Sequence, residues 1–334
     1  MKYKSVSATA RGGPEVLKII EHYLRPPGAE EICIRVLATT VCQDDVACRI
    51  GNRPFLPDIP FTPGYAVIGD VEKIGGEVKG FATSDWVGAL TNTGGYAEYI
   101  YLKPEQLVEV PFDLDPAEAV TLILNYLTAY QCLHRVAGVK QGDRILIIGA
   151  SGGVGTAFLQ LGKLAGIKMY GLASAKKQNF LTHLGAVPID YKTQDFVKII
   201  RSAEPDGLEY VYNGIDESYL ERGLAVLKRG GSLIHYGGPL SKKGLLLLIL
   251  KLVFYSAIPN GKTIKGYGTH RQDIGTFKQD WEILFSLLSE GKLKPIIAER
   301  FPILAAAEAN RYFEEGNFSG NIVLVAPDAD ADPY

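Results

Sequence analysis

The stretch RILIIGASGGVGTAFLQLGK, residues 144–163, decides the fold. A branched apolar run ends at Gly149, further glycines follow at positions 152, 153 and 155, and an apolar helical pattern comes next. A strand, a tight turn and a helix in this order bring backbone amides and a helix N-terminus close to a pyrophosphate. Ala150 replaces the first glycine of the usual G-x-G-x-x-G pattern. We predict a dinucleotide-binding turn, with a purely structural turn as the alternative.

The flanking sequence predicts a parallel sheet. From about Asp115 to Lys265 the chain repeats strand-then-helix units, such as KMYGLAS before KKQNFLTHLG and LEYVYNG before ESYLERGLAVLKRG. This alternation is typical of parallel strands joined by crossover helices. Residues 3–111 instead show short alternating runs between glycine and proline clusters, which indicate β-structure. The segment after Tyr267 is too small to stand alone and is expected to return to this first domain.

The predicted fold class is therefore α/β, with a Rossmann-type, doubly wound parallel-sheet domain inserted into a β-rich domain. We place the inserted dinucleotide-binding domain at residues 122–267 and the discontinuous catalytic domain at 1–121 and 268–334. A chain of 334 residues exceeds the usual size of one hydrophobic core, which agrees with two domains.

Composition narrows the possible partners and location. The chain is 47% hydrophobic and 22% charged, with a formal net charge of −2, and it has no basic block of the kind that binds nucleic acid. Its four cysteines form no C-x-x-C pair, which is typical of a reducing compartment. Because the first residues lack the apolar core of a signal peptide, we expect a cytoplasmic protein.

One apolar stretch, Leu245 to Ile258, could be mistaken for a membrane segment. Lys251 interrupts it, and it is shorter than the ~20 residues that span a bilayer. We expect a buried or interface helix and no membrane contact. Contact with a membrane surface is the alternative.

The residues after the next strand indicate which dinucleotide binds. An NAD enzyme needs a carboxylate there for the ribose hydroxyls, but GLASAKKQNF, residues 171–180, offers Ser174, Lys176 and Lys177. A hydroxyl and two cations suit a phosphate, and an anion would offset the cost of cations at a helix N-terminus. We predict NADPH. The alternative is that the lysines simply coat the first turn of the helix.

The whole chain, from about Tyr3 to Val325, resembles the zinc-free medium-chain dehydrogenase/reductases, in the branch of quinone oxidoreductases and vesicle amine transport protein-like proteins. The matching stretches, besides the glycine turn, are GGPEVL (12–17), FTPGY (61–65), GGYAEY (94–99), NYLTAY (125–130), PIDYKTQDF (188–196) and LSEGKLKPIIAERFPI (288–303).

The resemblance implies a GroES-like catalytic domain and a set of contacts for NADP(H). Ser174, Lys176 and Tyr191 match the adenosine-phosphate contacts, and Gly152, Gly153 and Val154 match those to the pyrophosphate. The remaining implied cofactor residues are Thr128, a nicotinamide anchor, and Asn213 and Gly237, which close the cleft. For each of them, maintenance of the fold is the alternative.

A catalytic zinc ion is not expected. Zinc-bearing relatives use a cysteine, a histidine in a G-H-E turn and a third ligand, and only the cysteine is present, as Cys42. Gln43 replaces the relay histidine, Pro63-Gly64-Tyr65 replaces the G-H-E turn, and Asn125 lies near the third position. The structural zinc lobe is also missing.

Without a Lewis acid, conjugate reduction is favoured over alcohol oxidation, since reduction needs a polarised carbonyl and a proton source. The catalytic candidates are Tyr65, Tyr126, Asn125 and Cys42. Tyr65 and Tyr126, or water, would donate the proton, and Asn125 would donate a hydrogen bond to the carbonyl. Cys42 departs from the asparagine common in relatives, and it is either a reactive thiol or a buried filler. For Asp45, fixing the local turn is the favoured role.

Three functions remain open. The first is reduction of a quinone or of an α,β-unsaturated carbonyl, with a small hydrophobic substrate. The second is a regulatory or membrane-associated NADPH-binding protein with little turnover, and the third is a biosynthetic tailoring enzyme with redirected chemistry. A further departure, Asn321, replaces a lysine common in relatives. The family also implies a homodimer, for which IKGYG at 264–268 is the expected edge strand.

Overall fold

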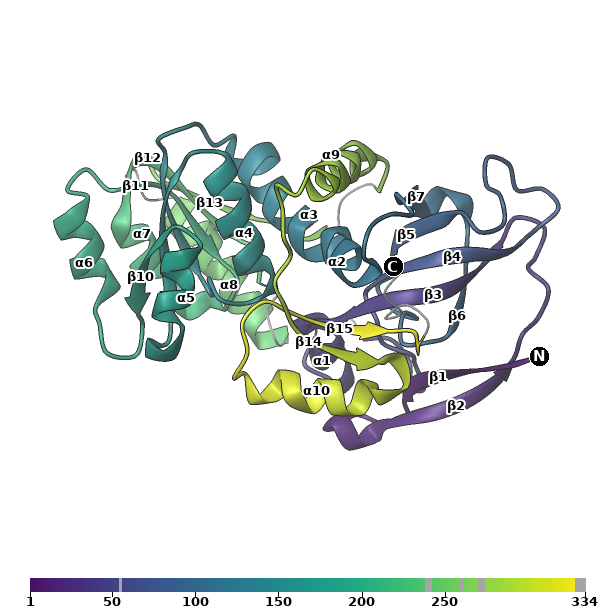
Figure 1. Ribbon diagram of the computed structural model, residues 1–334. Coiled ribbons are helices and arrows are strands. Elements are labelled where there is room, and N and C mark those ends of the chain that lie inside the picture. Colours follow the sequence, from purple (N-terminus) through teal and green to yellow (C-terminus); the bar gives the residue numbers. More distant parts are fainter. Residues whose placement is uncertain (54–55, 238–241, 257, 259–260, 270–273, 328–334) are drawn as a thin grey trace. The chain divides into compact units, whose positions relative to one another are not determined.

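The computed structural model describes the chain except for residues 54–55, 238–241, 257, 259–260, 270–273 and 328–334 (Figure 1). The chain forms two compact units, one made of Met1–Leu127 and Gln272–Tyr334, the other of Thr128–Arg271. We call them unit 1 and unit 2. The boundaries expected from the sequence, 121/122 and 267/268, lie a few residues away from these.

Unit 2 contains a six-stranded sheet in the order β10-β9-β8-β11-β12-β13, and every pairing in it is parallel. The predicted parallel sheet is confirmed. Its strands are β8 (Arg144–Ile148), β9 (Lys168–Ala173), β10 (Ala186–Asp190), β11 (Leu208–Asn213), β12 (Leu227–His235) and β13 (Thr263–Gly266). The chain winds outward from β8 to β10 and then, in the other direction, from β11 to β13. Neighbouring strands β8 and β11 therefore mark the switch point, where α/β sheets bind ligands at their carboxyl ends.

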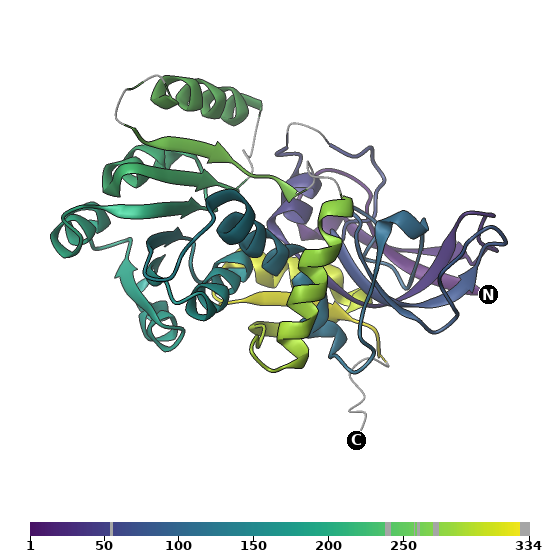
Figure 2. The ribbon, with the colours of Figure 1, turned by 90° about the horizontal axis from the view of Figure 1, so that it is seen from above.

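Helices cover both faces of this sheet (Figure 2). They are η4 (Gln131–Ala137), α4 (Gly153–Leu164), η5 (Ala175–Lys177), α5 (Gln178–His183), α6 (Phe196–Ala203), η6 (Glu217–Tyr219), α7 (Leu220–Val226) and α8 (Lys242–Ser256), after a short α3 (Leu127–Tyr130). Strand residues such as Leu146 and Val211 pack against Phe196 and Leu220 in one apolar core. Burial of this core holds the sheet edge, and with it the turns that follow each strand, in place.

Unit 1 is β-rich, as predicted. Its larger sheet has the order β14-β15-β3-β4-β5-β7 with β6 on β3, and β1 pairs with β2. The strands are β1 (Lys2–Ala8), β2 (Leu17–Tyr23), β3 (Ile32–Val41), β4 (Ala66–Ile74), β5 (Trp86–Leu90), β6 (Tyr99–Leu102), β7 (Leu107–Glu109), β14 (Ile297–Pro302) and β15 (Asn321–Val325). Because β15 pairs antiparallel with β3, the end of the chain completes a sheet that its beginning started.

The helices of unit 1 lie around this sheet (Figure 1). They are η1 (Pro14–Val16), α1 (Gln43–Ile50), η2 (Pro104–Gln106), α2 (Pro116–Thr121), η3 (Leu122–Tyr126), η8 (Ile274–Thr276), α9 (Lys278–Ser289), η9 (Ile303–Ala305) and α10 (Ala306–Glu315). The turn η3 is a π-helical widening, a feature frequent at functional sites, and it carries Asn125 and Tyr126.

The apolar stretch Leu245 to Ile258, expected to be a buried or interface helix, forms most of α8 and is buried on one face only. Leu248 is buried in the core of unit 2, but Leu250 and Val253 are 58% and 65% exposed. No helix in the described part of the chain is both long and apolar enough to cross a bilayer.

A buried arginine joins the two ends of unit 1. The Arg49 side chain, on α1, is fully buried, and its Nη2 lies 2.7 Å from Oε1 of Glu314 on α10. Its Nη1 donates to the Gly12 carbonyl. A guanidinium without water needs these partners, since an unpaired buried charge is strongly destabilising.

We expect Glu314→Gln to lower the free energy of unfolding by about 2 kcal/mol, because it leaves the Arg49 charge without its counterion. The estimate is below the usual cost for a fully buried pair, since the Glu314 side chain is 34% exposed. Urea unfolding checks this. Glu315→Gln is the matched control, because Glu315 is exposed and is expected to change stability little. Equal effects of the two substitutions would contradict the role given to Arg49.

Candidate functional site

The glycine turn of unit 2 has the predicted strand, turn and helix. Strand β8 ends at Ile148, Gly149 takes a positive φ of 87°, and α4 begins at Gly153 with Gly152 as its N-cap. The N-cap side-chain position is empty, and no acidic residue lies in the first turn of α4. The first amides of this helix therefore keep their donors for an outside acceptor such as a phosphate.

The glycines of the turn serve two different purposes. A Cβ on Gly155 would lie 2.3 Å from the Gly149 carbonyl oxygen and 2.6 Å from the Ala150 carbonyl carbon, so Gly155 allows the helix to approach the strand. A Cβ on Gly152 would have the Gly149 carbonyl oxygen, at 3.7 Å, as its nearest neighbour. The space beside Gly152 is thus open, as close approach of a pyrophosphate to the backbone requires.

The end of β9 carries the predicted adenosine-phosphate residues. Strand β9 ends at Ala173, and Ser174 then caps η5 without using its hydroxyl in the cap. Lys176 is exposed on η5 and Tyr191, after β10, is 42% exposed. Partial burial lowers the pKa of Lys177. Two lysines and two hydroxyl side chains follow these neighbouring strands at the carboxyl edge of the sheet.

The carboxylate of Asp190, at this edge of the sheet, already accepts hydrogen bonds from its own loop. Asp190 pairs with Ala173 across β10 and β9, so it lies one strand away from Ser174. Its Oδ1 accepts the Lys192 amide at 3.1 Å and its Oδ2 accepts the Thr193 hydroxyl at 2.7 Å. Asp190 is thus held in its own loop and is poorly placed to accept ribose hydroxyls.

Two further turns border the switch point. Asn213, the last residue of β11, is fully buried, donates from Nδ2 to the Asp216 carbonyl at 2.6 Å and accepts the Ile215 amide at 3.1 Å. Its side chain therefore shapes the loop. A Cβ on Gly237, after β12, would lie 2.7 Å from the Gly214 backbone, so only glycine fits there.

Thr128, the predicted nicotinamide anchor, lies elsewhere in unit 2. Its hydroxyl is buried and lies 2.9 Å from the hydroxyl of Thr269. The pair joins the helical segment before the sheet to the segment after β13.

The catalytic candidate Cys42 belongs to a buried cluster of unit 1. Cys42 is the N-cap of α1, and its amide and thiol both donate to Oδ2 of Asp45, at 3.0 and 3.1 Å. Oδ1 of Asp45 accepts the Gly64 amide at 2.8 Å, and the Tyr96 hydroxyl donates to Oδ2 at 3.3 Å. Asp45 therefore fixes the local turn, the role favoured from the sequence. Tyr96 was missed there, although it is the tyrosine in GGYAEY.

Burial controls the protonation of this cluster. Burial raises the pKa of Asp45 to about 6, and the hydrogen bonds from Gly64 and Cys42 oppose this rise. Burial, followed by the nearby Asp45 carboxylate, raises the pKa of the Cys42 thiol well above its usual value. Cys42 is thus a neutral hydrogen-bond donor, not the exposed thiolate of a reactive cysteine.

Tyr65 lies near the same cluster. It is 2% exposed and directly precedes β4. Burial raises the pKa of its hydroxyl, and the nearby carboxylate of Asp44 adds to the rise. Tyr65 directly follows Gly64, whose amide donates to the same Asp45 carboxylate that accepts the Cys42 thiol.

The other two catalytic candidates lie on η3. Nδ2 of Asn125 donates to Oδ1 of Asn321 at 2.6 Å, and Nδ2 of Asn321 donates to the Ile296 carbonyl at 2.9 Å. The two asparagines noted in the sequence as unusual are thus partners. Tyr126 is fully buried, and its hydroxyl has no hydrogen-bond partner among the described residues. Burial raises its pKa.

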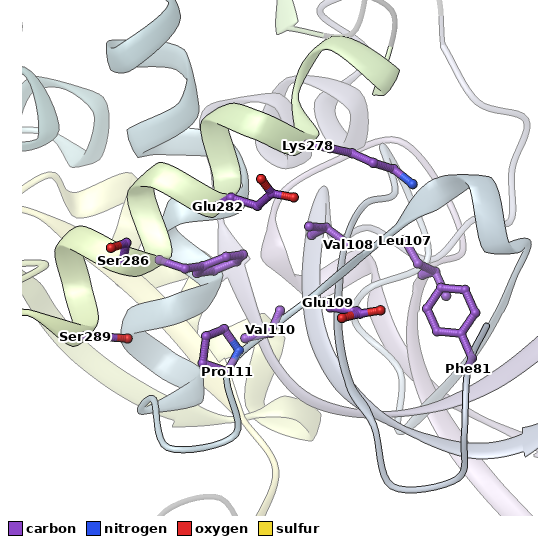
Figure 3. A pocket seen from close by; sticks show the side chains of 11 residues that line it. Phe81, Leu107, Val108, Glu109, Val110, Pro111, Lys278, Glu282, Ser286 and Ser289 are labelled. Carbon is purple, nitrogen blue, oxygen red and sulfur yellow. The ribbon is translucent and has the colours of Figure 1, made fainter.

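A pocket of about 600 Å³ lies between β7 and α9 in unit 1 (Figure 3). Glu109, Glu282 and Lys278 line it together with apolar side chains such as Phe81 and Val110. None of the residues predicted for catalysis or cofactor binding lines this pocket. We do not assign the chemistry to it.

Among the described residues, no group of three or more histidine, cysteine, aspartate or glutamate side chains is arranged to hold a metal ion. Cys42, the cysteine at the zinc-ligand position, has its thiol turned to Asp45.

The raised pKa of Asp45 predicts a pH dependence of stability. Between about pH 4 and pH 6 the folded state holds a proton that the unfolded chain has released, so the free energy of unfolding falls as pH rises through this window, by up to about 3 kcal/mol. Asp45→Asn removes this contribution, whereas the control Asp44→Asn retains it. Denaturant unfolding at a series of pH values measures both, and an unchanged slope in Asp45→Asn would contradict the assignment.

Two family models match the chain. The alcohol dehydrogenase GroES-like domain matches residues 28–112, and the zinc-binding dehydrogenase family matches residues 184–324. A quinone oxidoreductase of Sus scrofa is 31% identical over 306 residues, which cover 90% of each chain. A synaptic vesicle membrane protein VAT-1 homolog of Danio rerio is 29% identical over 337 residues, which cover 96% of this chain and 70% of the relative.

Solved structures of similar fold also match nearly the whole chain. A mycobacterial protein complexed with NADPH has a TM-score of 0.84 at 25% identity, and the CurK enoyl reductase has a TM-score of 0.83 at 25% identity. Both matches cover 97% of this chain and 99% of the other. These findings confirm the predicted fold and support a nicotinamide cofactor. The chain belongs to the medium-chain dehydrogenase/reductase superfamily of oxidoreductases, in the branch of the quinone oxidoreductases and VAT-1 homologues.

Proposed function

We propose that the protein is an NADPH-dependent reductase that transfers hydride, without zinc, to a quinone or to the activated double bond of an α,β-unsaturated carbonyl. The observation that carries the choice of NADPH is the end of β9. Ser174 and Lys176 follow that strand, and the neighbouring carboxylate of Asp190 is occupied by its own loop. An adenosine phosphate fits a hydroxyl and a cation, whereas the residues that directly follow β9 include no carboxylate to accept unmodified ribose hydroxyls.

The cofactor residues fit this proposal. Gly152, Gly153 and Val154 would hold the pyrophosphate with backbone amides at the start of α4, where the structure leaves open space. Ser174, Lys176 and Tyr191 would hold the adenosine phosphate, and Thr128 would orient the nicotinamide. Gly237 and Asn213 would shape the neighbouring loops. When bound, NADPH supplies the hydride.

The proposal excludes zinc on the chemistry of this chain's own residues. One matching family is described as zinc-binding dehydrogenases. However, the thiol of Cys42 donates to Asp45, and the positions of the other two ligands carry Tyr65 and Asn125. A phenol and an amide are poor zinc ligands, and one cysteine alone does not make a zinc site.

The acceptor needs hydrogen bonds to its carbonyl and a proton. Asn125 keeps one Nδ2 hydrogen beyond the one given to Asn321, so it would serve as the carbonyl's donor. Tyr65 and Tyr126 would serve as proton donors, because the Cys42 thiol is committed to Asp45. The Tyr126 hydroxyl has no other partner among the described residues. A small hydrophobic carbonyl or quinone suits such buried donors. Separately, we propose that the active form is a homodimer.

The proposal is tested by following NADPH oxidation with a panel of quinones, enones and enoyl thioesters. Turnover of one class, unchanged after dialysis against a zinc chelator, is expected. Tight NADPH binding without turnover of any class would favour a binding protein or redirected chemistry. Loss of turnover after chelation would contradict the zinc-free proposal.

Lys176→Ala should raise the Kd for NADPH about tenfold or more, because it removes a charged hydrogen-bond donor to the phosphate. The Kd for NADH should stay nearly unchanged. Fluorescence titration with each dinucleotide measures both constants. Lys163→Ala is the control, since Lys163 is also exposed but lies at the opposite end of α4. If Lys176→Ala weakened both dinucleotides equally, the phosphate contact would be wrong.

A further inference from the structure

One groove of unit 1 contains none of the residues predicted for catalysis or cofactor binding. It is the pocket of about 600 Å³ between β7 and α9, which is lined by five consecutive residues, Leu107 to Pro111, and by one side of α9 (Figure 3). Successive side chains of a strand point to opposite faces, so a pocket that contacts all five residues runs along the edge of the strand. We call this pocket the β7–α9 groove.

The strand that borders this groove has an open edge. Strand β7 is the last strand at one end of the larger sheet of unit 1, and no further strand pairs with its outer side in the described part of the chain. On its inner side, the Val110 amide donates to the Trp86 carbonyl at 2.9 Å, and Glu109 lies opposite Val87 of β5. Hydrogen bonding in an antiparallel ladder alternates along each strand, so the amide and carbonyl of Glu109 turn outward, away from β5. The groove therefore borders an edge that can accept another strand.

The two walls of the groove have similar lengths. On α9 the lining residues run from Lys278 to Ser289, which corresponds to about 16 Å along a helix axis. The five residues from Leu107 to Pro111 cover about the same distance in extended conformation. An extended peptide of about five residues therefore matches the groove, and pairing with an exposed sheet edge is a common mode of peptide binding.

The groove combines apolar and acidic side chains. Val108, Val110 and Phe285 line it and are buried. Glu109 and Glu282 are exposed, and within the described residues neither carboxylate forms an ion pair or a side-chain hydrogen bond. Both carboxylates are therefore available to a ligand.

The charge of the groove favours a positively charged ligand. Among the described residues that line it, Lys278 is the one cation, against the two carboxylates of Glu109 and Glu282. The lining is thus net negative. Across a pair of strands, side chains directly opposite each other lie on the same face, and opposite charges in this position stabilise the pairing. A basic residue opposite Glu109 would satisfy this condition.

We propose that the β7–α9 groove binds an extended peptide segment of a partner protein, in which a basic residue stands between two apolar residues, and that this segment adds to the sheet beside β7. The basic residue would exchange two backbone hydrogen bonds with Glu109, and its side chain would lie on the same face as the Glu109 carboxylate. Its two apolar neighbours would turn to the other face of the strand, where Val108 and Val110 lie.

Charge separates this partner from two others. If two β7 edges paired about a twofold axis centred on Glu109, the two Glu109 carboxylates would lie opposite each other, and like charges in this position oppose the pairing. The expected dimer edge, β13, belongs to unit 2 and is a different surface. A nucleic acid would bring phosphates against Glu109 and Glu282. A basic, extended peptide meets neither obstacle.

The test is fluorescence polarisation of short labelled peptides with the full-length protein. The first peptide has a central valine–lysine–valine between threonine and serine residues, and we expect it to bind. Replacing its lysine by glutamate, or methylating the backbone nitrogen of that lysine, should each raise the Kd about tenfold or more. Methylation removes the amide that would donate to the Glu109 carbonyl and keeps every side chain, so it separates strand addition from electrostatic attraction alone. Both changes are made in the peptide, so a folding defect of the protein cannot imitate them.

Variants of the protein test the same contacts from the other side. Glu109→Lys should weaken binding of the lysine peptide and restore binding of the glutamate peptide, because it reverses the cross-strand charge pair. Ser286→Trp should block the groove, since Ser286 lines it from an exposed position on α9. Two matched controls should bind the lysine peptide as the parent does. Glu299→Lys changes an exposed glutamate of β14, at the other end of the same sheet, and Gln279→Trp changes an exposed residue of α9 that does not line the groove.

Four results would each overturn the proposal. The lysine peptide does not bind; the glutamate peptide binds equally well; the methylated peptide binds equally well; or Ser286→Trp binds the lysine peptide normally. Equal binding of the methylated peptide would identify the groove as a site for side chains or small molecules, without addition of a strand.

Discussion

The close approach of α4 to β8 is the contact on which the proposed cofactor site of unit 2 depends. With 2.3 Å between the Gly149 carbonyl oxygen and the place of a Gly155 Cβ, any other residue would push the helix away from the strand. The helix N-terminus would then no longer face the turn at Gly152. This turn lies beside the switch point of the sheet, at the same edge as the loops after β9, β11 and β12. The position of the turn relative to these loops therefore depends on the glycine at position 155.

Unit 1 depends on a different kind of constraint, a buried carboxylate. Asp45 collects donors from the N-terminus of α1, from the turn before β4 and from Tyr96. A carboxylate in this place costs desolvation, which appears as its raised pKa. The same carboxylate fixes the position of Cys42 by accepting hydrogen bonds from its amide and its thiol. The residue that a zinc enzyme would ionise is here used to connect three segments of backbone.

Local patterns predicted the fold well, since strand-then-helix units and the glycine turn depend on neighbours in sequence. The cofactor residues come partly from the glycine turn and partly from the resemblance to the family, and they stay predictions. Long-range partners were beyond this reasoning: Asn125 and Asn321 are 196 positions apart, and Tyr96 is 51 positions from Asp45. The exposure of α8 was missed because a helix that is apolar all round gives no periodicity from which its buried face could be identified.

The pairing of β15, late in the chain, with β3, early in the chain, has a consequence for folding during translation. Strand β3 ends at Val41, but its neighbour β15 is formed only by residues 321–325. During translation, the strands of unit 2 are all complete by Gly266, while the Ala38–Val41 end of β3 still lacks its partner β15. The inserted unit can therefore fold on the ribosome before the unit that surrounds it in sequence is complete. Until β15 is made, residues Ala38–Val41 of β3 form an unpaired strand edge, which is exposed to pairing with other chains.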